Sequence, residues 1–312
     1  MKKLFLALLL TLALAVPAAQ AQAQDQEAKK ITIGSTVYYM SEFITLMVEG
    51  MKAEAEELGV ELSILDAGND ASVQLNQVEN LLTNKVDVVL VAAVDADAIV
   101  PALDMAENAG IPLTGVNMLM NTDKPYYYAG PNDVEAGELE AQYVVDALGG
   151  KGNVVILEGP IGTSAQLQRL EGNMNVLNKY PDVKILVQKP ANWNREQALN
   201  TMENWLQTYP DQIEGVIAHN DEMALGAIQA LEAKGIRIPV GSVDAIKDAC
   251  QAIKDGRLDA TVFQDAVLEG RLGVRVAYQV ATGNPPAERL NFIKMELITK
   301  DNVDTLLDTI YK

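Results

Sequence analysis

Short apolar runs rich in β-branched residues alternate with longer amphipathic segments through the first half of the chain. The runs occupy residues 31–36, 61–68, 86–94, 111–117 and 126–131. Apolar positions recur every three or four residues over 41–58, which predicts a helix there, and further helices are predicted to begin near Asp70 and Asp95. Strand and helix periods in strict alternation predict an α/β fold with parallel sheets covered by helices on both faces.

The same alternation begins again in the second half. Five more strand-like runs lie at 152–160, 183–190, 213–221, 238–244 and 258–265, and each but the last precedes a helical pattern. Residue identities do not repeat and no short period is present, so the duplication is one of architecture and not a solenoid. The junction near 130–133 is a short polar turn without a flexible linker. The sequence therefore predicts two lobes in close register, which suits a chain of 312 residues.

The N-terminal residues have the pattern of an export signal. Lys2 and Lys3 precede an apolar stretch, residues 4–16, that is interrupted only by Thr11. This stretch is shorter than the about 20 residues that span a bilayer, and small-residue cleavage patterns follow it. We expect 1–23 to be a signal peptide cleaved near residues 21–23, and no cysteine follows it to make a lipoprotein.

Charge and cysteine content narrow the function classes. The formal net charge is −19, and it becomes −21 once the two lysines of the signal are removed. A surface of this sign repels phosphates, so nucleic acid and anionic lipid are not expected as partners. At 49% hydrophobic residues the chain nevertheless folds. The single cysteine, Cys250, cannot form an internal disulfide and lies on an apolar helical stripe, which predicts an inert core thiol.

Polar residues follow the predicted strands at the positions where ligands bind in parallel α/β sheets, beyond the carboxyl ends. They are Ser41, Asn117, Arg169, Trp193, Asn220, Asp244 and Gln264. Amides, one hydroxyl, one guanidinium and one carboxylate recognise hydroxyl groups, and an indole covers the C–H face of a ring. Trp193 lies among polar residues, so we predict that it is exposed and stacks on a ligand. Tyr38 and Tyr39 are placed to close over that ligand.

Catalytic and metal-binding interpretations fit the sequence less well. His219 is the only histidine, whereas a zinc site normally needs three or four ligands. The acidic residues 221–222 after it suit the first turn of a helix, where the macrodipole favours negative charge. The glycine-rich segment 158–166 lacks the lysine and the spacing of nucleotide-binding loops, which favours a tight turn capped by Thr163 or Ser164. We expect no catalytic residue, no metal and no cofactor.

Three longer stretches carry a family resemblance. They read GTSAQLQRLEG at 162–172, NDEMALGAIQAL at 220–231 and VDAIKDACQAIKDGRLDATVFQD at 243–265. With these stretches and their spacing, the chain resembles the periplasmic solute-binding proteins of ABC sugar importers, in particular the ribose-binding-protein-like group, from residue 31 to about residue 298. The resemblance implies a type I periplasmic binding protein fold, in which two doubly wound parallel-sheet lobes are joined by a three-segment hinge. It also implies a binding protein and not an enzyme.

The resemblance assigns roles to individual residues. Arg169 matches an arginine that forks onto ring hydroxyls, and Trp193 matches an aromatic residue that stacks on the sugar. Asn220 matches the amide of the N-D-E-M motif. Asp244 matches a carboxylate at a strand end, and Gln264 matches a hinge-side glutamine.

The chain also departs from the family pattern at the N-terminal lobe. Asn117 and Met118 replace an Asp-Arg pair, and Phe43 keeps one of two aromatic residues at the entry to the first helix. The loop that carries Tyr39 and leads to Ser41 is about two residues longer. Losing charge-assisted contacts changes which hydroxyls are recognised, so we expect a neutral pentose, hexose or reduced or cyclic polyol in place of ribose itself.

Further expectations concern organisation and partners. The predicted divisions are a signal peptide at 1–23, an N-terminal lobe at 30–131, a C-terminal lobe at 132–263, a return to the N-terminal lobe at 264–291, and a return to the C-terminal lobe with the tail at 292–312. The expected partners are the sugar or polyol and the membrane permease of an ABC importer, for a periplasmic monomer. Presentation to a chemoreceptor is one alternative, and a secreted α/β hydrolase that uses Asp244 or Glu158 is another. A transcription regulator is disfavoured by the signal peptide.

Overall fold

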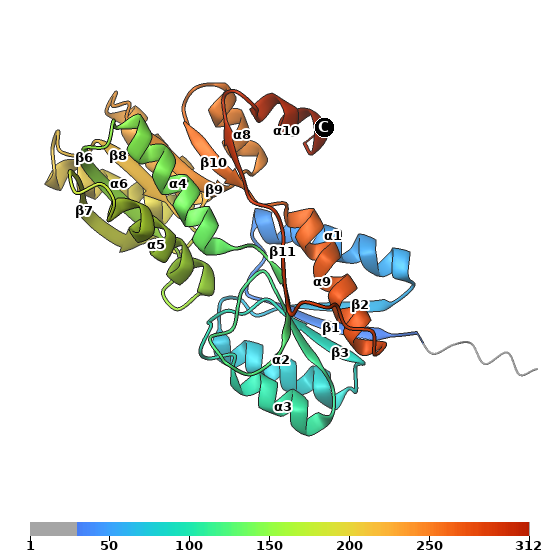
Figure 1. Ribbon diagram of the computed structural model, residues 1–312. Coiled ribbons are helices and arrows are strands. Elements are labelled where there is room, and N and C mark those ends of the chain that lie inside the picture. Colours follow the sequence, from blue (N-terminus) through green and yellow to red (C-terminus); the bar gives the residue numbers. More distant parts are fainter. Residues whose placement is uncertain (1–29, 312) are drawn as a thin grey trace, which may run out of the picture.

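The computed structural model describes residues 30–311, so the predicted signal peptide lies outside the described residues. The chain forms two lobes, each built around a six-stranded sheet with helices against its faces (Figure 1). The N-terminal sheet contains β1 (Thr32–Val37), β2 (Glu61–Asp66), β3 (Val88–Val91), β4 (Leu113–Val116), β5 (Tyr127–Gly130) and β11 (Leu290–Phe292). Its helices are α1 (Glu42–Leu58), α2 (Ala71–Thr83), α3 (Pro101–Ala109) and α9 (Ala266–Ala281).

The C-terminal lobe repeats this arrangement. Its strands are β6 (Gly152–Glu158), β7 (Val183–Pro190), β8 (Gly215–Ala218), β9 (Val240–Asp244), β10 (Ala260–Phe263) and β12 (Glu296–Thr299). Its helices are α4 (Asp133–Ala147), α5 (Ser164–Leu177), α6 (Arg195–Thr208), α7 (Asp221–Ala233), α8 (Lys247–Lys254) and α10 (Val303–Thr309). The strand orders, β11-β5-β4-β3-β1-β2 and β12-β10-β9-β8-β6-β7, are those of doubly wound sheets and confirm the predicted fold class.

The edge strands differ from the prediction. All ten predicted strands are present, but the short strands β11 and β12 were not expected from the sequence. β11 pairs with β5 in parallel, whereas β12 pairs with β10 antiparallel, so the C-terminal sheet is not wholly parallel. Each extra strand is three or four residues long, too short to show a hydrophobic period.

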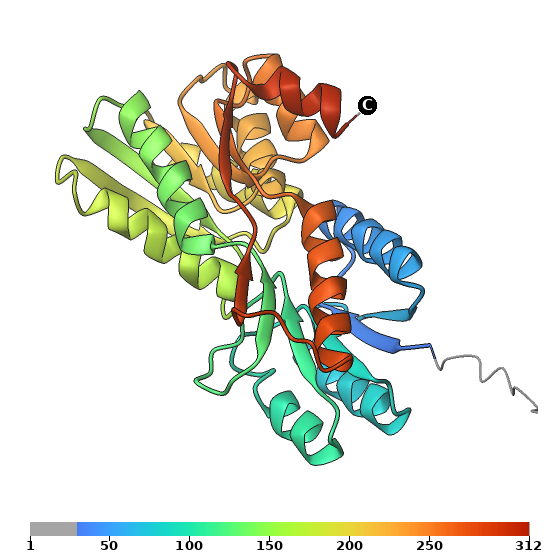
Figure 2. The same ribbon diagram turned by 45° about the vertical axis from the view of Figure 1, so that its right-hand side comes forward.

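The chain passes between the lobes three times. The crossings follow β5, β10 and β11, and the last of these is visible as the extended red segment that connects the lobes in Figure 2. Helix α9 returns to the N-terminal lobe and packs along α1 (Figures 1 and 2). The exact lobe boundaries given above stay a prediction.

The third helix begins later than the sequence suggests. α3 starts at Pro101, not near Asp95. The Asp95 carboxylate accepts hydrogen bonds from the backbone N–H groups of Asp97 and Ala98, at 3.0 and 2.7 Å, and closes an isolated turn. Proline is favoured at the first helical position, so the regular helix begins only at Pro101.

The interior contains the predicted core thiol. Cys250 is fully buried on α8, and burial, with the nearby Asp221, raises its pKa to about 12. A thiol with so high a pKa is protonated at neutral pH and is a poor nucleophile. Within residues 30–311, no helix is both long and apolar enough to cross a bilayer.

Candidate functional site

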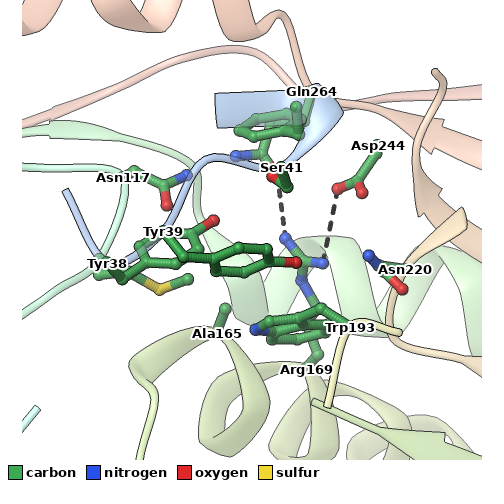
Figure 3. Close-up of a pocket in the computed structure, with 12 residues that line it drawn as sticks. Tyr38, Tyr39, Ser41, Asn117, Ala165, Arg169, Trp193, Asn220, Asp244 and Gln264 are labelled. Atoms are coloured by element: carbon green, nitrogen blue, oxygen red, sulfur yellow. Dashed lines mark hydrogen bonds and ion pairs between the residues drawn. The ribbon is translucent and has the colours of Figure 1, made fainter. Parts of the chain in front are cut away.

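One pocket collects every residue that the sequence analysis singled out for ligand binding. It lies between the lobes, beyond the carboxyl ends of the strands (Figure 3). The lining residues are Tyr38, Tyr39, Ser41, Phe43, Asn117 and Met118 from the N-terminal lobe, Ala165, Arg169, Trp193, Asn220 and Asp244 from the C-terminal lobe, and Gln264 from a crossing. Polar and aromatic side chains from both lobes thus converge on one site, as is typical of small-molecule pockets.

The lobes meet around this pocket. The backbone N–H of Ala96 donates to the carbonyl of Gly162 at 2.9 Å. The Ser164 hydroxyl accepts from the backbone N–H of Leu119 at 2.8 Å and donates to the Met118 sulfur at 3.6 Å. These contacts join the loops of the two lobes, so the structure is that of a closed clamp.

Three lining residues have a strained backbone. Asn117, Trp193 and Asp244 have φ values of 63°, 56° and 120°, a region that costs a residue with a side chain about 1–3 kcal/mol. All three lie where a strand gives way to a loop. Such strain persists only where the surroundings hold it, and it is concentrated at binding sites.

Hydrogen bonds to the Asp221 carboxylate stabilise the turn at Asp244. This carboxylate is fully buried and accepts hydrogen bonds from the hydroxyls of Ser242 and Thr261 and, at 2.8 Å, from the backbone N–H of Ile246. Burial raises its pKa to about 7, although these hydrogen bonds oppose the shift. Asp221 does lie in the first turn of α7. Its three hydrogen bonds also fasten the loop that presents Asp244.

Arg169 lies at the centre of the pocket floor. Helices α4 and α5 approach so closely that a Cβ on Gly137 would stand 2.2 Å from the Arg169 carbonyl. This approach places the guanidinium beside Asp133, whose Oδ1 accepts from Nε at 2.8 Å. The other two nitrogens donate to the carbonyl of His219 and, at 2.9 Å, to Oε1 of Gln264. Figure 3 shows the guanidinium between Gln264 and Asp244.

The charge of Arg169 is retained in spite of its burial. The side chain is only 5% exposed. Burial lowers its pKa, but the carboxylates of Asp133, Asp244 and Glu140 more than offset this, so the net shift is upward. The pocket therefore holds a permanent cation that faces two carboxylates.

His219 lies behind the pocket and not in it. Its Nε2 is 3.1 Å from Oδ1 of Asn173. The Asn173 amide donates to the Gly137 carbonyl and the Glu140 carboxyl, so its oxygen must accept, and Nε2 carries the imidazole proton. Burial, with help from Arg169, lowers the His219 pKa to about 3, so the ring is neutral at pH 7. No cluster of three or more potential metal ligands occurs within residues 30–311.

Several polar atoms of the pocket have no partner in the protein. Oδ1 of Asn117 and Nε1 of Trp193 are buried and make no hydrogen bond to any described residue. The Asp244 carboxylate accepts no hydrogen bond from residues 30–311, and its nearest cation, Nη1 of Arg169, is 3.8 Å away. Burial raises the Asp244 pKa, which Arg169 opposes. A ligand that both donates and accepts hydrogen bonds would satisfy these groups.

Other predicted residues are already engaged in part. The Ser41 hydroxyl caps α1 by accepting from Ile44 N–H at 3.2 Å, and Oδ1 of Asn220 caps α7 by accepting from Met223 N–H at 3.1 Å. Asn220 thus offers the pocket only its NH₂ group. The Gln264 amide uses its oxygen and one N–H on protein groups. The sequence indicates which residues meet, but not which of their atoms are free.

The aromatic residues enclose the pocket. Trp193 is only 6% exposed, so the prediction of an exposed ring is wrong. Its loop folds back against Gly159, where an added Cβ would lie 2.0 Å from the indole, and the ring lies 5.6 Å from the Arg169 guanidinium. Tyr38 and Tyr39 stack at an angle, with ring centroids 5.5 Å apart, and burial raises the pKa of Tyr39 to about 12.

Sequence reasoning missed the buried acids around Arg169. Asp133 and Glu269 do not line the pocket, yet both belong to the hydrogen-bond network of Arg169 and Gln264. Asp133 is also the first residue of a helix, where an acid is ordinary, so no local signal distinguishes it. Ala165 also lines the pocket without any signal in the sequence.

Known proteins resemble this chain in sequence and in fold. Residues 33–285 match the family described as periplasmic binding protein domain. The chain is 42% identical over 277 residues to the xylitol-binding protein of Mycolicibacterium smegmatis, covering 88% of this chain and 79% of that protein. It is 36% identical to the ribose import binding protein of Bacillus subtilis, covering 82% and 83%. A structure of an ABC transporter solute-binding protein from Bacillus halodurans with bound myo-inositol superposes with a TM-score of 0.84 at 36% identity, covering 88% and 96%.

Proposed function

The chain belongs to the type I periplasmic sugar-binding proteins of ABC transporters, and we propose that its pocket captures one neutral monosaccharide or polyol. The ligand is held between the closed lobes and is then released to an import permease. The residues that hold it are Tyr39, Ser41, Phe43, Asn117, Met118, Arg169, Trp193, Asn220, Asp244 and Gln264. The protein binds its ligand without transforming it, as this family does, which removes the hydrolase alternative.

The unpaired polar groups of the pocket carry the ligand proposal. The Asp244 carboxylate and the Asn117 oxygen need donors, whereas the Trp193 N–H and the Asn220 amide need acceptors. A hydroxyl group both donates and accepts hydrogen bonds, so adjacent hydroxyls on one small molecule would satisfy all four groups. An anionic ligand would bring its charge to the Asp244 carboxylate, which accepts no hydrogen bond from residues 30–311. A neutral polyhydroxylated ligand is therefore favoured.

The similar proteins support this ligand class. Their names or bound ligands are xylitol, ribose and myo-inositol, which are all neutral and carry hydroxyls on most carbons. At Asn117 and Met118 the chain lacks the charged pair expected from the resemblance. This loss favours a ligand recognised by fewer charge-assisted contacts, such as a polyol.

Export and partnership complete the proposal. The N-terminal pattern supports removal of a signal peptide at about residues 21–23 and release into the periplasm. The permease partner follows from the family. A monomeric state and presentation to a chemoreceptor stay predictions.

A thermal-shift screen tests the proposal. The protein is unfolded and refolded to strip any carried ligand, and its melting temperature is measured with xylitol, myo-inositol, ribose and other neutral sugars. At a ligand concentration 100 times Kd, stability rises by about 2.7 kcal/mol, which corresponds to roughly 4–5 °C for a chain of this size. No shift with any neutral sugar or polyol would contradict the proposal.

Two variants test whether the ligand that raises the melting temperature binds in the pocket. Arg169→Ala and Asp244→Ala should each abolish it, because each removes a group that no neighbour replaces and leaves another buried polar group unpaired. Arg257→Ala is the matched control, since this arginine lies on the surface beside Glu232 at 3.5 Å. A shift that survives in both pocket variants would place the ligand elsewhere.

A further inference from the structure

Arg169 contacts one of the three segments that cross between the lobes and the residue directly after another. Asp133 immediately follows the first crossing, which leaves β5 at Gly130, and Gln264 lies in the second crossing, between β10 and α9. Nε of Arg169 donates to Asp133 Oδ1 at 2.8 Å, and Nη2 donates to Gln264 Oε1 at 2.9 Å. Both partners are buried. One side chain of the pocket is thus bonded to the second crossing and to the start of the helix that the first crossing leads into.

The network continues into the N-terminal lobe. Gln264 Nε2 donates to Glu269 Oε2 at 2.9 Å, and Glu269 is fully buried on α9. On the first crossing, the Tyr128 hydroxyl of β5 contacts the carbonyls of Asn117 and Pro131 at 2.9 and 3.3 Å. A chain of buried hydrogen bonds therefore runs from Asp133 in one lobe, through Arg169 and Gln264, to Glu269 in the other.

Two carboxylates compete for the guanidinium. Asp133 holds Nε by a direct hydrogen bond, while Asp244 stands 3.8 Å from Nη1 without one. If Asp133 released Arg169, the guanidinium could move onto Asp244 and pair with it directly. That movement would occupy the carboxylate that the ligand needs and would break the contact with Gln264.

We propose that Asp133 is a positioning residue that fixes Arg169 against the hinge, so that lobe closure depends on ligand binding at Arg169. The inference rests on the proposed function, because it takes the pocket as the place where the ligand binds. Asp133 acts through Arg169 and does not line the pocket itself. It keeps Asp244 open for the ligand and keeps the guanidinium bonded to the second crossing.

The test compares three variants in a Trp205→Phe background, which leaves Trp193 as the only tryptophan. Asp133→Ala removes the hydrogen bond and the charge, whereas Asp133→Asn keeps an acceptor oxygen and removes only the charge. Glu135→Ala is the matched control, since Glu135 is an exposed acid in the same first turn of α4. Each variant is titrated with xylitol, myo-inositol and ribose by calorimetry. Lobe closure is followed by small-angle X-ray scattering.

We expect Asp133→Ala to bind about ten- to hundredfold more weakly, as for the loss of a hydrogen bond to a charged group. Asp133→Asn should fall between this variant and the wild type, and Glu135→Ala should bind normally. With saturating ligand, Asp133→Ala should keep a larger radius of gyration than the wild type. A residue that only stabilised the fold would lower the melting temperature and leave these quantities unchanged. Wild-type affinity in Asp133→Ala and Asp133→Asn, or an equal loss in Glu135→Ala, would overturn the inference.

Tryptophan fluorescence separates this inference from the proposed function. Arg169 lies 5.6 Å from the Trp193 ring centroid, so a displaced guanidinium alters the emission without any ligand. Ligand-free Asp133→Ala and Asp133→Asn should therefore differ from the wild type in emission wavelength. Identical emission in all three would refute the positioning role. Failure of the wild type to bind any of the probes would count against the proposed function alone.

Discussion

Replacement of Gly162 by alanine would disturb the closed clamp while leaving every ligand-facing group in place. The Gly162 carbonyl accepts from the Ala96 N–H across the lobes at 2.9 Å. A Cβ at this position would stand 2.2 Å from Oδ2 of Asp95. Asp95 belongs to the N-terminal lobe and Gly162 to the C-terminal lobe, so the clash exists only when the lobes are closed.

The size of the effect follows from these contacts. With a φ of 93°, alanine at position 162 is strained in the open and closed forms alike, which costs about 1–3 kcal/mol of stability but no affinity. Closure additionally loses one hydrogen bond, worth about 0.5–1.5 kcal/mol. Asp95 must also rotate and give up its contacts to Asp97 and Ala98 N–H. A total of about 1.5–3 kcal/mol against the closed form corresponds to a Kd raised roughly ten- to hundredfold.

Calorimetric titration of a bound sugar or polyol measures this change. A double-mutant cycle with Asp95→Ala isolates the clash, because removal of the Asp95 carboxylate should restore part of the affinity of Gly162→Ala. The reasoning is refuted if Gly162→Ala binds as tightly as the wild type. It is also refuted if Asp95→Ala makes the same difference to affinity whether residue 162 is glycine or alanine.

Three further predictions concern single side chains. The His219 pKa is lowered to about 3, so between pH 3 and about pH 6.5 the folded protein binds fewer protons than the unfolded chain. The free energy of unfolding should therefore fall as the pH drops through this window, by up to about 1.4 kcal/mol per pH unit. Urea denaturation should show a smaller loss from pH 7 to 5 in His219→Gln, and equal losses would contradict the assignment. Burial raises the Glu269 pKa to about 8, so the free energy of unfolding should instead fall as the pH rises from 5 to 8. In the same urea assay, Glu269→Gln should not show this loss of stability. Gly159→Ala should displace the Trp193 ring together with its N–H and weaken binding several-fold. An unchanged Kd would show that the indole does not contact the ligand.

The alternation of strand and helix patterns was sufficient to predict the fold class, because buried parallel strands are short, nearly continuous apolar runs between longer amphipathic helices. The features that this pattern did not predict were local. β12 is a four-residue edge strand. The start of α3 depends on a side-chain turn at Asp95 and on Pro101, and neither feature changes the hydrophobic period of the sequence. These features depend on single hydrogen bonds and edge pairings that follow from the folded structure.

The pocket was predictable for a related reason. In a parallel sheet the strand ends converge, so polar residues after successive strands meet even when they are far apart in sequence. Which partner each polar atom binds was not predictable from the sequence. Whether Asn220 caps a helix or contacts a ligand, and whether Trp193 is exposed, depends on how loops fold over one another. The hold of Asp133 on Arg169 likewise depends on the close crossing of two helices.

Calorimetric titration of the refolded, ligand-free protein tests the central claim most directly. The titrants are neutral sugars and polyols, including xylitol, ribose and myo-inositol, each paired where possible with an acidic derivative. We predict that at least one neutral compound binds with one molecule per chain, that its acidic derivative does not bind, and that Arg169→Ala and Asp244→Ala abolish the heat. Binding confined to acidic compounds, or binding that persists in both variants, would contradict a closed clamp on a neutral polyhydroxylated ligand.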